Sequence, residues 1–324
     1  MGKIGVLANP ASGKDVRRLV ARASVFDNQE KRAIVRRAIV GALSTGGNEF
    51  VYHNDAHGIT RGALEEFATD VRATTVDSTQ MGSALDTISA ARAMREAQCD
   101  VVITLGGDGT NRAFCLGWPD APLLPISTGT NNVFPTLREA TVAGAAAGLL
   151  ASGQIGRDML SQQKCISVAI EGERDDLALI DVLLTSERFV GARALLKPNQ
   201  FRSALLTRAE PDAVGITSIG GLLHPVDSFA DEGLWLEFGD GGDVVNAPIA
   251  PGLYQDIGVR ACQPLKLEKT VRCVGPGTLA FDGERERTLT DGQEAKLTLS
   301  RSGPMVMDVS AALYRAAEIG SFKR

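Results

Sequence analysis

The first half of the chain alternates short apolar runs with longer stretches in which apolar residues recur every three or four positions. The short runs predict strands at residues 4–8, 50–53, 101–105 and 123–126. The longer stretches predict helices at residues 15–43, 61–67, 82–97 and 136–151. Strands that alternate with helices indicate βαβ units, and therefore an α/β, Rossmann-like domain with a doubly wound parallel sheet.

The pattern changes in the second half, where helical periodicity fades from about residue 164 and short strands stand between Gly, Pro and Asp. Strands are predicted at residues 165–170, 178–184, 234–238, 278–281 and 295–299. Asp282-Gly283 and Asp291-Gly292 are dipeptides typical of hairpins. We therefore expect domains at 1–158 and 159–302, the second all-β, and a segment at 303–324 with a helix that returns to the first domain.

Composition narrows the function classes. The 324 residues are 44% apolar and 23% charged with a net charge of −5, as in ordinary soluble globular proteins. No basic block favours nucleic acid, and no basic amphipathic helix favours a membrane surface. The chain begins with a predicted strand instead of an export leader, and five scattered cysteines show no metal or redox spacing. These features predict a cytoplasmic protein without its own metal site.

The most informative stretch is the glycine-rich turn after the predicted strand at 101–105. It consists of Gly106, Gly107, Asp108, Gly109 and Thr110. Glycines let a backbone approach phosphate groups closely, and a carboxylate held there is a candidate general base. The alternative is a tight strand-to-helix turn whose Asp or Thr caps the helix.

Two further polar loops follow predicted strands. The first contains Asn9, Ser12, Gly13 and Lys14, and the second runs from Ser127 to Asn132. Loops at the carboxyl ends of parallel strands line one crevice, so the three loops are expected to meet there. The first loop lacks the second glycine and the Lys-Ser/Thr pair of a Walker loop. Ordinary turns, one with proline and one with an Asx cap, remain the alternatives for these two loops.

These motifs resemble a known superfamily. Residues 106–110 resemble the signature shared by NAD kinases, diacylglycerol kinases and sphingosine kinases. Residues 9–14 and Gly129-Thr130-Asn131-Asn132 resemble two nucleotide loops of the diacylglycerol kinase branch, with Asn131 in place of a glycine. In its details the chain is most similar to the acetoin-catabolism protein X group. This resemblance implies a Rossmann-like domain, a β-sandwich domain, ATP and Mg²⁺ between them, and a homo-oligomer.

The resemblance also implies roles for individual residues. Asp108 is the expected catalytic base, with Asp282 or Glu284 of the Asp-Gly-Glu sequence as a second acid, although Asp-Gly also fits an ordinary hairpin. Lys14 and Arg112 are expected to neutralise phosphate charge. The expected acceptor-binding residues are Asn111, Asp181, Gly220 and Gly221. The expected nucleotide-binding residues are Asn9, Ser12, Gly13, Lys14, Gly106, Gly107, Gly109, Thr110, Thr128, Gly129, Thr130 and Asn132.

The acceptor is less well specified than the nucleotide. Residues 178–184 resemble the Ala-Leu-Asn-acid stretch of NAD kinases, but Ile180 replaces the asparagine. Residues 213–217 stand where NAD kinases carry Thr-Gly-Ser-Thr-Ala-Tyr. The first hypothesis is an ATP-dependent kinase that converts NAD to NADP. The alternatives are a kinase for another small hydroxylated metabolite or a lipid, and a nucleotide-binding regulator without turnover.

Overall fold

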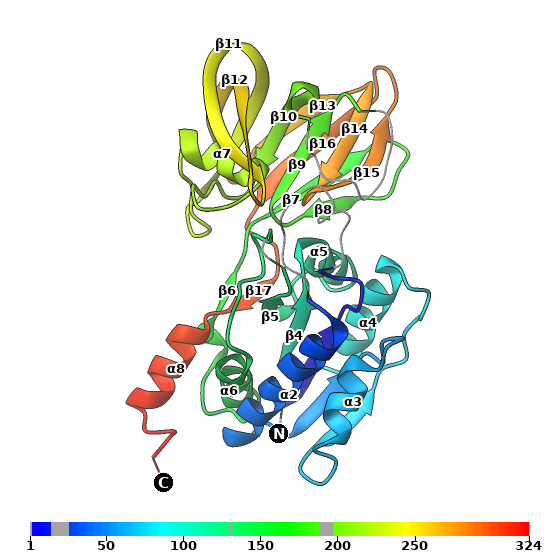
Figure 1. Ribbon diagram of the computed structural model, residues 1–324, viewed down its shortest axis with the longest axis vertical. Coiled ribbons are helices and arrows are strands. Elements are labelled where there is room, and N and C mark those ends of the chain that lie inside the picture. Colours follow the sequence, from blue (N-terminus) through cyan, green and yellow to red (C-terminus); the bar gives the residue numbers. More distant parts are fainter. Residues whose placement is uncertain (1, 14–25, 130, 188–196, 324) are drawn as a thin grey trace.

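The computed structural model describes residues 2–13, 26–129, 131–187 and 197–323, which form two regions stacked along the long axis (Figure 1). The lower region is an α/β domain around a seven-stranded sheet, in the order β3-β2-β1-β4-β5-β17-β6. Its strands are β1 (Ile4–Ala8), β2 (Glu49–Tyr52), β3 (Arg72–Thr75), β4 (Val101–Gly106), β5 (Pro122–Ser127), β6 (Leu160–Gln162) and β17 (Met305–Met307). All neighbours pair in parallel except β6, which runs antiparallel to β17.

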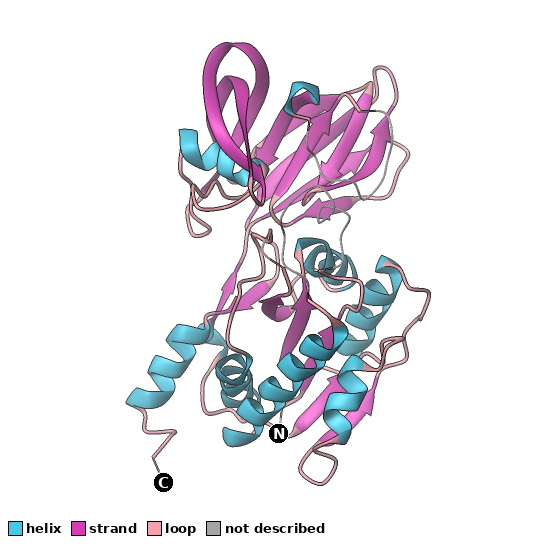
Figure 2. Ribbon diagram, in the orientation of Figure 1, coloured by secondary structure: helices cyan, strands magenta, loops and turns pink. Residues whose placement is uncertain are grey.

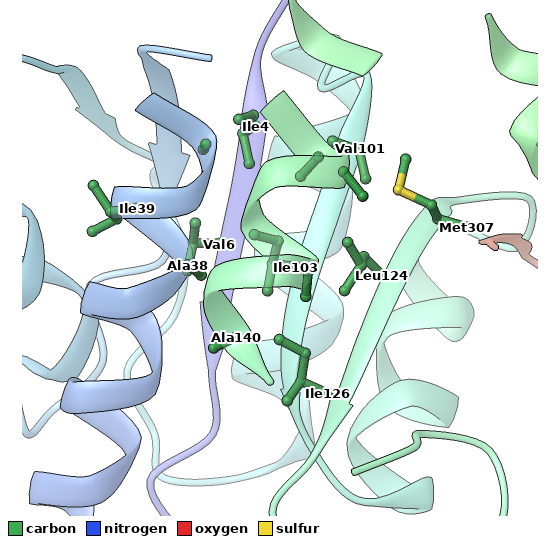
Figure 3. Packing of buried hydrophobic residues seen from close by; sticks show 14 of the residues in the cluster. Ile4, Val6, Ala38, Ile39, Val101, Ile103, Leu124, Ile126, Ala140 and Met307 are labelled. Atoms are coloured by element: carbon green, nitrogen blue, oxygen red, sulfur yellow. The ribbon is translucent and has the colours of Figure 1, made fainter. Parts of the chain in front are cut away.

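Helices cover both faces of this sheet. They are α2 (Asn28–Ser44), α3 (Ile59–Glu65), α4 (Ala84–Glu96), α5 (Asp108–Gly117), α6 (Ala140–Ala151) and α8 (Val309–Glu318). Figure 3 shows one face, where Ile4 and Ile103 pack against Ala38 and Ile39 of α2 and Ala140 of α6. The opposite face packs against α4 and α5. Apolar residues on both faces explain why the strands read as continuous hydrophobic runs.

The upper region is rich in antiparallel sheet (Figure 2). One sheet has the order β12-β11-β10-β9-β14-β15, and the other has the order β13-β16-β7-β8. The strands are β7 (Cys165–Ile170), β8 (Asp176–Ala178), β9 (Asp181–Thr185), β10 (Phe201–Leu206), β11 (Glu232–Ala250), β12 (Leu253–Lys266), β13 (Thr270–Val274), β14 (Gly277–Phe281), β15 (Glu284–Leu289) and β16 (Glu294–Ser300). A shared apolar cluster joins the two sheets, and α7 (Ile216–Leu223) packs against β10 and β11.

Two differences from the expectation concern expected site residues. The stretch 178–184 is not one strand, because β8 ends at Ala178 and β9 begins at Asp181. Gly220 and Gly221 lie inside α7, a helix that the sequence pattern did not predict. A Cβ at Gly221 would overlap the backbone of Glu210, so glycine permits close packing of this helix.

The chain crosses between the two regions twice. It leaves the first sheet after β6 and returns at β17, which pairs with both β5 and β6. Residues 160–162, which fall within the expected second domain, therefore belong to the first sheet. The expected C-terminal helix is present as α8 and packs on α6.

Candidate functional site

The three predicted loops meet at the carboxyl ends of β1, β4 and β5. The Asn9 amide donates a hydrogen bond to the Thr110 hydroxyl at 2.9 Å. The Thr128 hydroxyl donates to the Ser12 hydroxyl at 2.9 Å, and the Thr128 backbone N–H donates to the Gly106 carbonyl at 3.3 Å. These contacts connect loops more than a hundred residues apart into one polar surface.

The third loop is folded around Ser127. Its hydroxyl accepts a hydrogen bond from the Asn132 amide at 2.7 Å and donates to the Gly129 carbonyl at 2.8 Å. Asn132 also lies against the glycine-rich turn, because a Cβ at Gly107 would come within 2.8 Å of its Oδ1. Glycine at this position therefore allows the second and third loops to touch. Thr130 lies outside the described residues.

A lysine that the sequence did not indicate holds the first loop in place. Lys31 on α2 is fully buried, and its Nζ donates to the carbonyls of Asn9 (3.0 Å), Pro10 (3.0 Å) and Ser12 (2.6 Å). Gly13, with a positive φ of 68°, ends the described part of this loop. Lys14 lies outside the described residues.

The glycine-rich turn opens directly into α5. Its N-cap is Gly107, which supplies no side-chain hydrogen bond, so the helix begins without a side-chain cap. A Cβ at Gly106 would overlap the Thr110 side chain. A helix start without a side-chain cap, together with the helix dipole, is a favourable place for a phosphate group.

Asp108 is the first residue of α5, and its carboxylate is held by the third loop. It accepts hydrogen bonds from the backbone N–H of Val133 at 3.1 Å and of Phe134 at 2.8 Å. The carboxylate therefore has a defined position between the helix end and residues 133–134.

Asp282 occupies the hairpin turn between β14 and β15, with a positive φ of 48°. Its carboxylate accepts hydrogen bonds from the backbone N–H of Leu179, Ile180 and Asp181, at 2.8 to 3.1 Å. Burial raises the pKa of this carboxyl above its ordinary value, although the Arg112 charge and these N–H groups oppose the effect. The hydrogen bonds to Asp282 explain why β8 and β9 are separate strands, since the backbone N–H groups of residues 179–181 donate to its carboxylate.

Glu284, two residues later, is half-buried and comes close to the glycine-rich turn. Its Oε1 would lie 3.2 Å from a Cβ at Gly109. The second region thus places a carboxylate beside the start of α5.

A cavity of about 50 Å³, partly open to solvent, lies between the two regions. The structure brings three of the expected acids, Asp108, Asp181 and Asp282, to its wall. Its other lining residues are Asn131, Val133, Ile180, Val214, Gly215, Ile216, Thr217, Ile249, Ala250 and Gly283. Residues 214–217, from the segment that departs from the NAD kinase pattern, thus form part of this wall.

Other expected site residues are used elsewhere in the fold. The Asn111 amide is fully buried, where it accepts from the Thr104 hydroxyl and donates to the Gly107 carbonyl. Gly220 and Gly221 are not among the cavity's lining residues. The expectation that Arg112 neutralises phosphate is wrong, because its buried guanidinium pairs with Asp176 of β8.

Arg208 is a second buried cation that the sequence did not indicate. It follows β10, is 9% exposed, and donates from Nη2 to Gln163 Oε1 at 3.1 Å. Its Nε is buried with no hydrogen-bond partner among the described residues. Burial lowers the pKa of Arg208, whereas the charges of Glu210, Asp108 and Asp282 raise it. The guanidinium therefore lies within the electrostatic reach of two cavity carboxylates.

Within the described residues, no three His, Cys, Asp or Glu side chains gather closely enough to hold a metal ion. No described helix has both the length and the apolar character needed to cross a bilayer.

Family comparisons divide the chain in the same way as the fold. Residues 4–155 match the ATP-NAD kinase N-terminal domain, and residues 164–302 match the acetoin catabolism protein X C-terminal domain. Acetoin catabolism protein X of Cupriavidus necator is 35% identical over 329 residues, covering 97% of this chain and 92% of that protein. An uncharacterized protein of Archaeoglobus fulgidus is 30% identical over 135 residues, covering 42% of this chain and 37% of that protein.

Among solved structures, yeast NADH kinase complexed with NADH has a similar fold. Its TM-score is 0.52 at 14% identity, and the match covers 100% of this chain and 88% of that one. A diacylglycerol kinase from Bacillus anthracis matches with a TM-score of 0.47 at 13% identity, covering 94% of this chain and 96% of that one.

Proposed function

The chain belongs to the acetoin catabolism protein X family, and we propose that it is an ATP-dependent phosphotransferase that phosphorylates a hydroxyl group. The observation that carries the proposal is the position of Asp108. It stands at the uncapped start of α5, and it shares a cavity with acids of the second region. Phosphoryl transfer depends on positioning and charge stabilisation, which such an arrangement supplies.

The nucleotide would bind to the surface that the three loops form. Support comes from the hydroxyls of Ser12 and Thr128 and from the glycines at 106, 107 and 109, beside an uncapped helix end. Phosphate at the start of α5 would be stabilised by N–H groups and the helix dipole. Mg²⁺, if bound with the nucleotide, would offset phosphate charge, a role that needs no cluster of protein ligands.

In the proposed chemical step, Asp108 is the base. Its carboxylate would accept the proton of the acceptor hydroxyl while the acceptor oxygen forms a bond to the γ-phosphorus. The bond from that phosphorus to the β,γ-bridging oxygen breaks, and ADP leaves with the electron pair. Proton acceptance of this kind contributes about two to four orders of magnitude. Glu284 lies against Gly109 and is the better-placed second acid. The Asp282 carboxylate, in contrast, accepts hydrogen bonds from three backbone N–H groups.

NAD is the first acceptor hypothesis, because residues 4–155 match the ATP-NAD kinase N-terminal domain. A second candidate, a small hydroxylated metabolite, is favoured by a specific observation. Ile180 and residues 214–216 make part of the cavity wall apolar. A nucleotide-binding regulator without turnover would keep the three loops but lack a working acceptor site.

The test measures ADP release from ATP and Mg²⁺ with purified full-length protein and three acceptors. These are NAD, a short hydroxyketone and diacylglycerol. Acceptor-dependent ADP release with a phosphorylated product supports the kinase. ATP binding without any such release indicates the regulator, and failure to bind ATP at millimolar concentration contradicts both.

A further inference from the structure

The cavity beside Asp108 is lined by both acidic and apolar side chains. Asp108, Asp181 and Asp282 provide carboxylates. The apolar lining residues are Val133, Ile180, Val214, Ile216, Ile249 and Ala250. No lysine or arginine occurs among the lining residues of the described chain. Such a site offers hydrogen-bond acceptors to a hydroxyl and apolar contact to the carbon atoms next to it.

Two of the apolar lining residues, Val214 and Ile216, lie in a segment that is held by hydrogen bonds. The Gly215 N–H donates to the Pro248 carbonyl at 2.8 Å, which ties the segment before α7 to β11. The Ser218 hydroxyl donates to the Gly215 carbonyl at 2.7 Å. Gly215 has a φ of 100°, a conformation that side-chain-bearing residues rarely adopt. Val214 and Ile216, on either side of this anchored glycine, are therefore held as a rigid wall.

Charge restricts what can lie against this wall. An anionic acceptor group would meet three carboxylates of the same sign, and the buried Arg208 offsets their charge only in part, so such a group is disfavoured. A cationic group would lose water against apolar side chains. A neutral group avoids both penalties.

We infer that the acceptor is a small uncharged alcohol with a short apolar substituent, and that Val214 and Ile216 determine this preference. The inference rests on the proposed phosphotransferase function and selects the second of its two acceptor candidates, a small hydroxylated metabolite, in place of NAD. The cavity, about 50 Å³ and partly open to solvent, must hold the acceptor hydroxyl and the carbon atoms next to it. This space suits a molecule of a few carbon atoms better than a dinucleotide.

The experiment uses three compounds with one carbon skeleton and different charge. Propylene glycol is neutral, lactate is anionic and isopropanolamine is cationic, and a four-carbon hydroxyketone and NAD complete the panel. Acceptor-dependent ADP release is measured for the full chain with ATP and Mg²⁺. We expect kcat/KM for the better neutral compound to exceed that for lactate and isopropanolamine by at least about tenfold. NAD should support no comparable turnover.

Two variants locate the origin of the preference. Val214→Lys puts an ammonium group on the apolar wall, at a half-buried position that tolerates substitution. The substitution should lower kcat/KM for the neutral compounds by at least about tenfold. The ratio of kcat/KM for lactate to kcat/KM for the neutral compounds should rise. Val244→Lys is the matched control, because Val244 is 70% exposed on β11 and does not line the cavity. It should behave as the unmodified protein.

Each outcome has a separate meaning. Equal or better use of lactate, isopropanolamine or NAD overturns the inference and leaves the kinase proposal intact. ADP release with NAD alone, or an unchanged acceptor preference in Val214→Lys, also overturns the inference and leaves the kinase proposal intact. If ATP binds but no acceptor of any charge supports ADP release, the kinase proposal fails and the inference falls with it.

Discussion

The guanidinium of Arg112 donates a hydrogen bond of 2.6 Å to the carboxylate of Asp176, and both side chains are 5% exposed. Arg112 lies on α5, four residues after Asp108, whereas Asp176 lies on β8 of the second region. The Arg112 Nε also donates to the Leu177 carbonyl at 2.6 Å, and its guanidinium lies 4.8 Å from the centre of the Phe281 ring. This buried pair fixes the helix that carries Asp108 against the second region.

Replacing Arg112 should therefore destabilise the protein strongly. Arg112→Met leaves the buried Asp176 carboxylate with the Leu177 backbone N–H and the partly exposed Arg287 as its partners among the described residues. We expect the free energy of unfolding to fall by about 3–5 kcal/mol, the usual effect of breaking a buried ion pair. Urea unfolding measures it. Arg272→Met, which removes an exposed pair with Glu294, should change it by less than about 1 kcal/mol. Equal losses in the two variants would contradict this interpretation.

The Lys31→Met substitution should weaken ATP binding indirectly, through its effect on the first loop. The substitution removes the donor for the carbonyls of Asn9, Pro10 and Ser12, so the first loop loses its anchor. Loss of such bonds corresponds to about 1–3 kcal/mol, and we expect the Kd for ATP to rise by at least about tenfold. Calorimetric titration measures it, with Arg37→Met on the exposed side of α2 as control. Unchanged affinity in Lys31→Met would exclude this role.

Arg208 should act as a positioning residue that keeps the cavity carboxylates ionised. A nearby cation stabilises a negative charge, so Asp108 and Asp282 should take up protons at higher pH in Arg208→Met. The acid limb of the kcat profile should move to higher pH, and Arg208→Lys should restore much of its position. A lower kcat with an unmoved acid limb would indicate a merely structural role.

Because of Lys164, the free energy of unfolding should depend on pH in the alkaline range. It is 1% exposed, and burial lowers its pKa to about 8. The unfolded chain keeps the ordinary lysine pKa of about 10.4, so it binds more protons between these two values. The free energy of unfolding should therefore rise with pH in this window, by at most about 1.4 kcal/mol per unit.

Lys164→Met should lose this slope, and Lys296→Met, at an exposed position on β16, should keep it. Thermal or urea unfolding at several pH values measures both slopes. A Lys164→Met protein with the same slope as the unmodified chain would refute the assignment.

The parts of the fold that follow local patterns were predictable. The strand at residues 4–8 is confirmed by β1, and the strand at 101–105 by β4, because both faces are apolar and polar loops end the runs. The three loops meet because parallel strands present their carboxyl ends at one edge. This convergence follows from strand order alone.

Features that depend on distant partners were not predictable. The break between β8 and β9 exists because Asp282, about a hundred residues away, accepts their backbone amides. From its place in the sequence, Arg112 was expected to lie beside a phosphate-binding loop. Its partner in the structure, Asp176, lies 64 residues away in the sequence. Lys31 and Arg208 carry no local signal, since nothing near them in sequence marks either cation as buried.

The central claim is that Asp108 is the base for phosphoryl transfer, and Asp108→Asn tests it most directly. The amide oxygen can still accept from the backbone N–H of Phe134, so the melting temperature should stay close to that of the unmodified protein. With the best acceptor found, kcat should fall about 100- to 10,000-fold while the Kd for ATP changes by less than about twofold. A folded Asp108→Asn protein that retains its turnover would contradict the account.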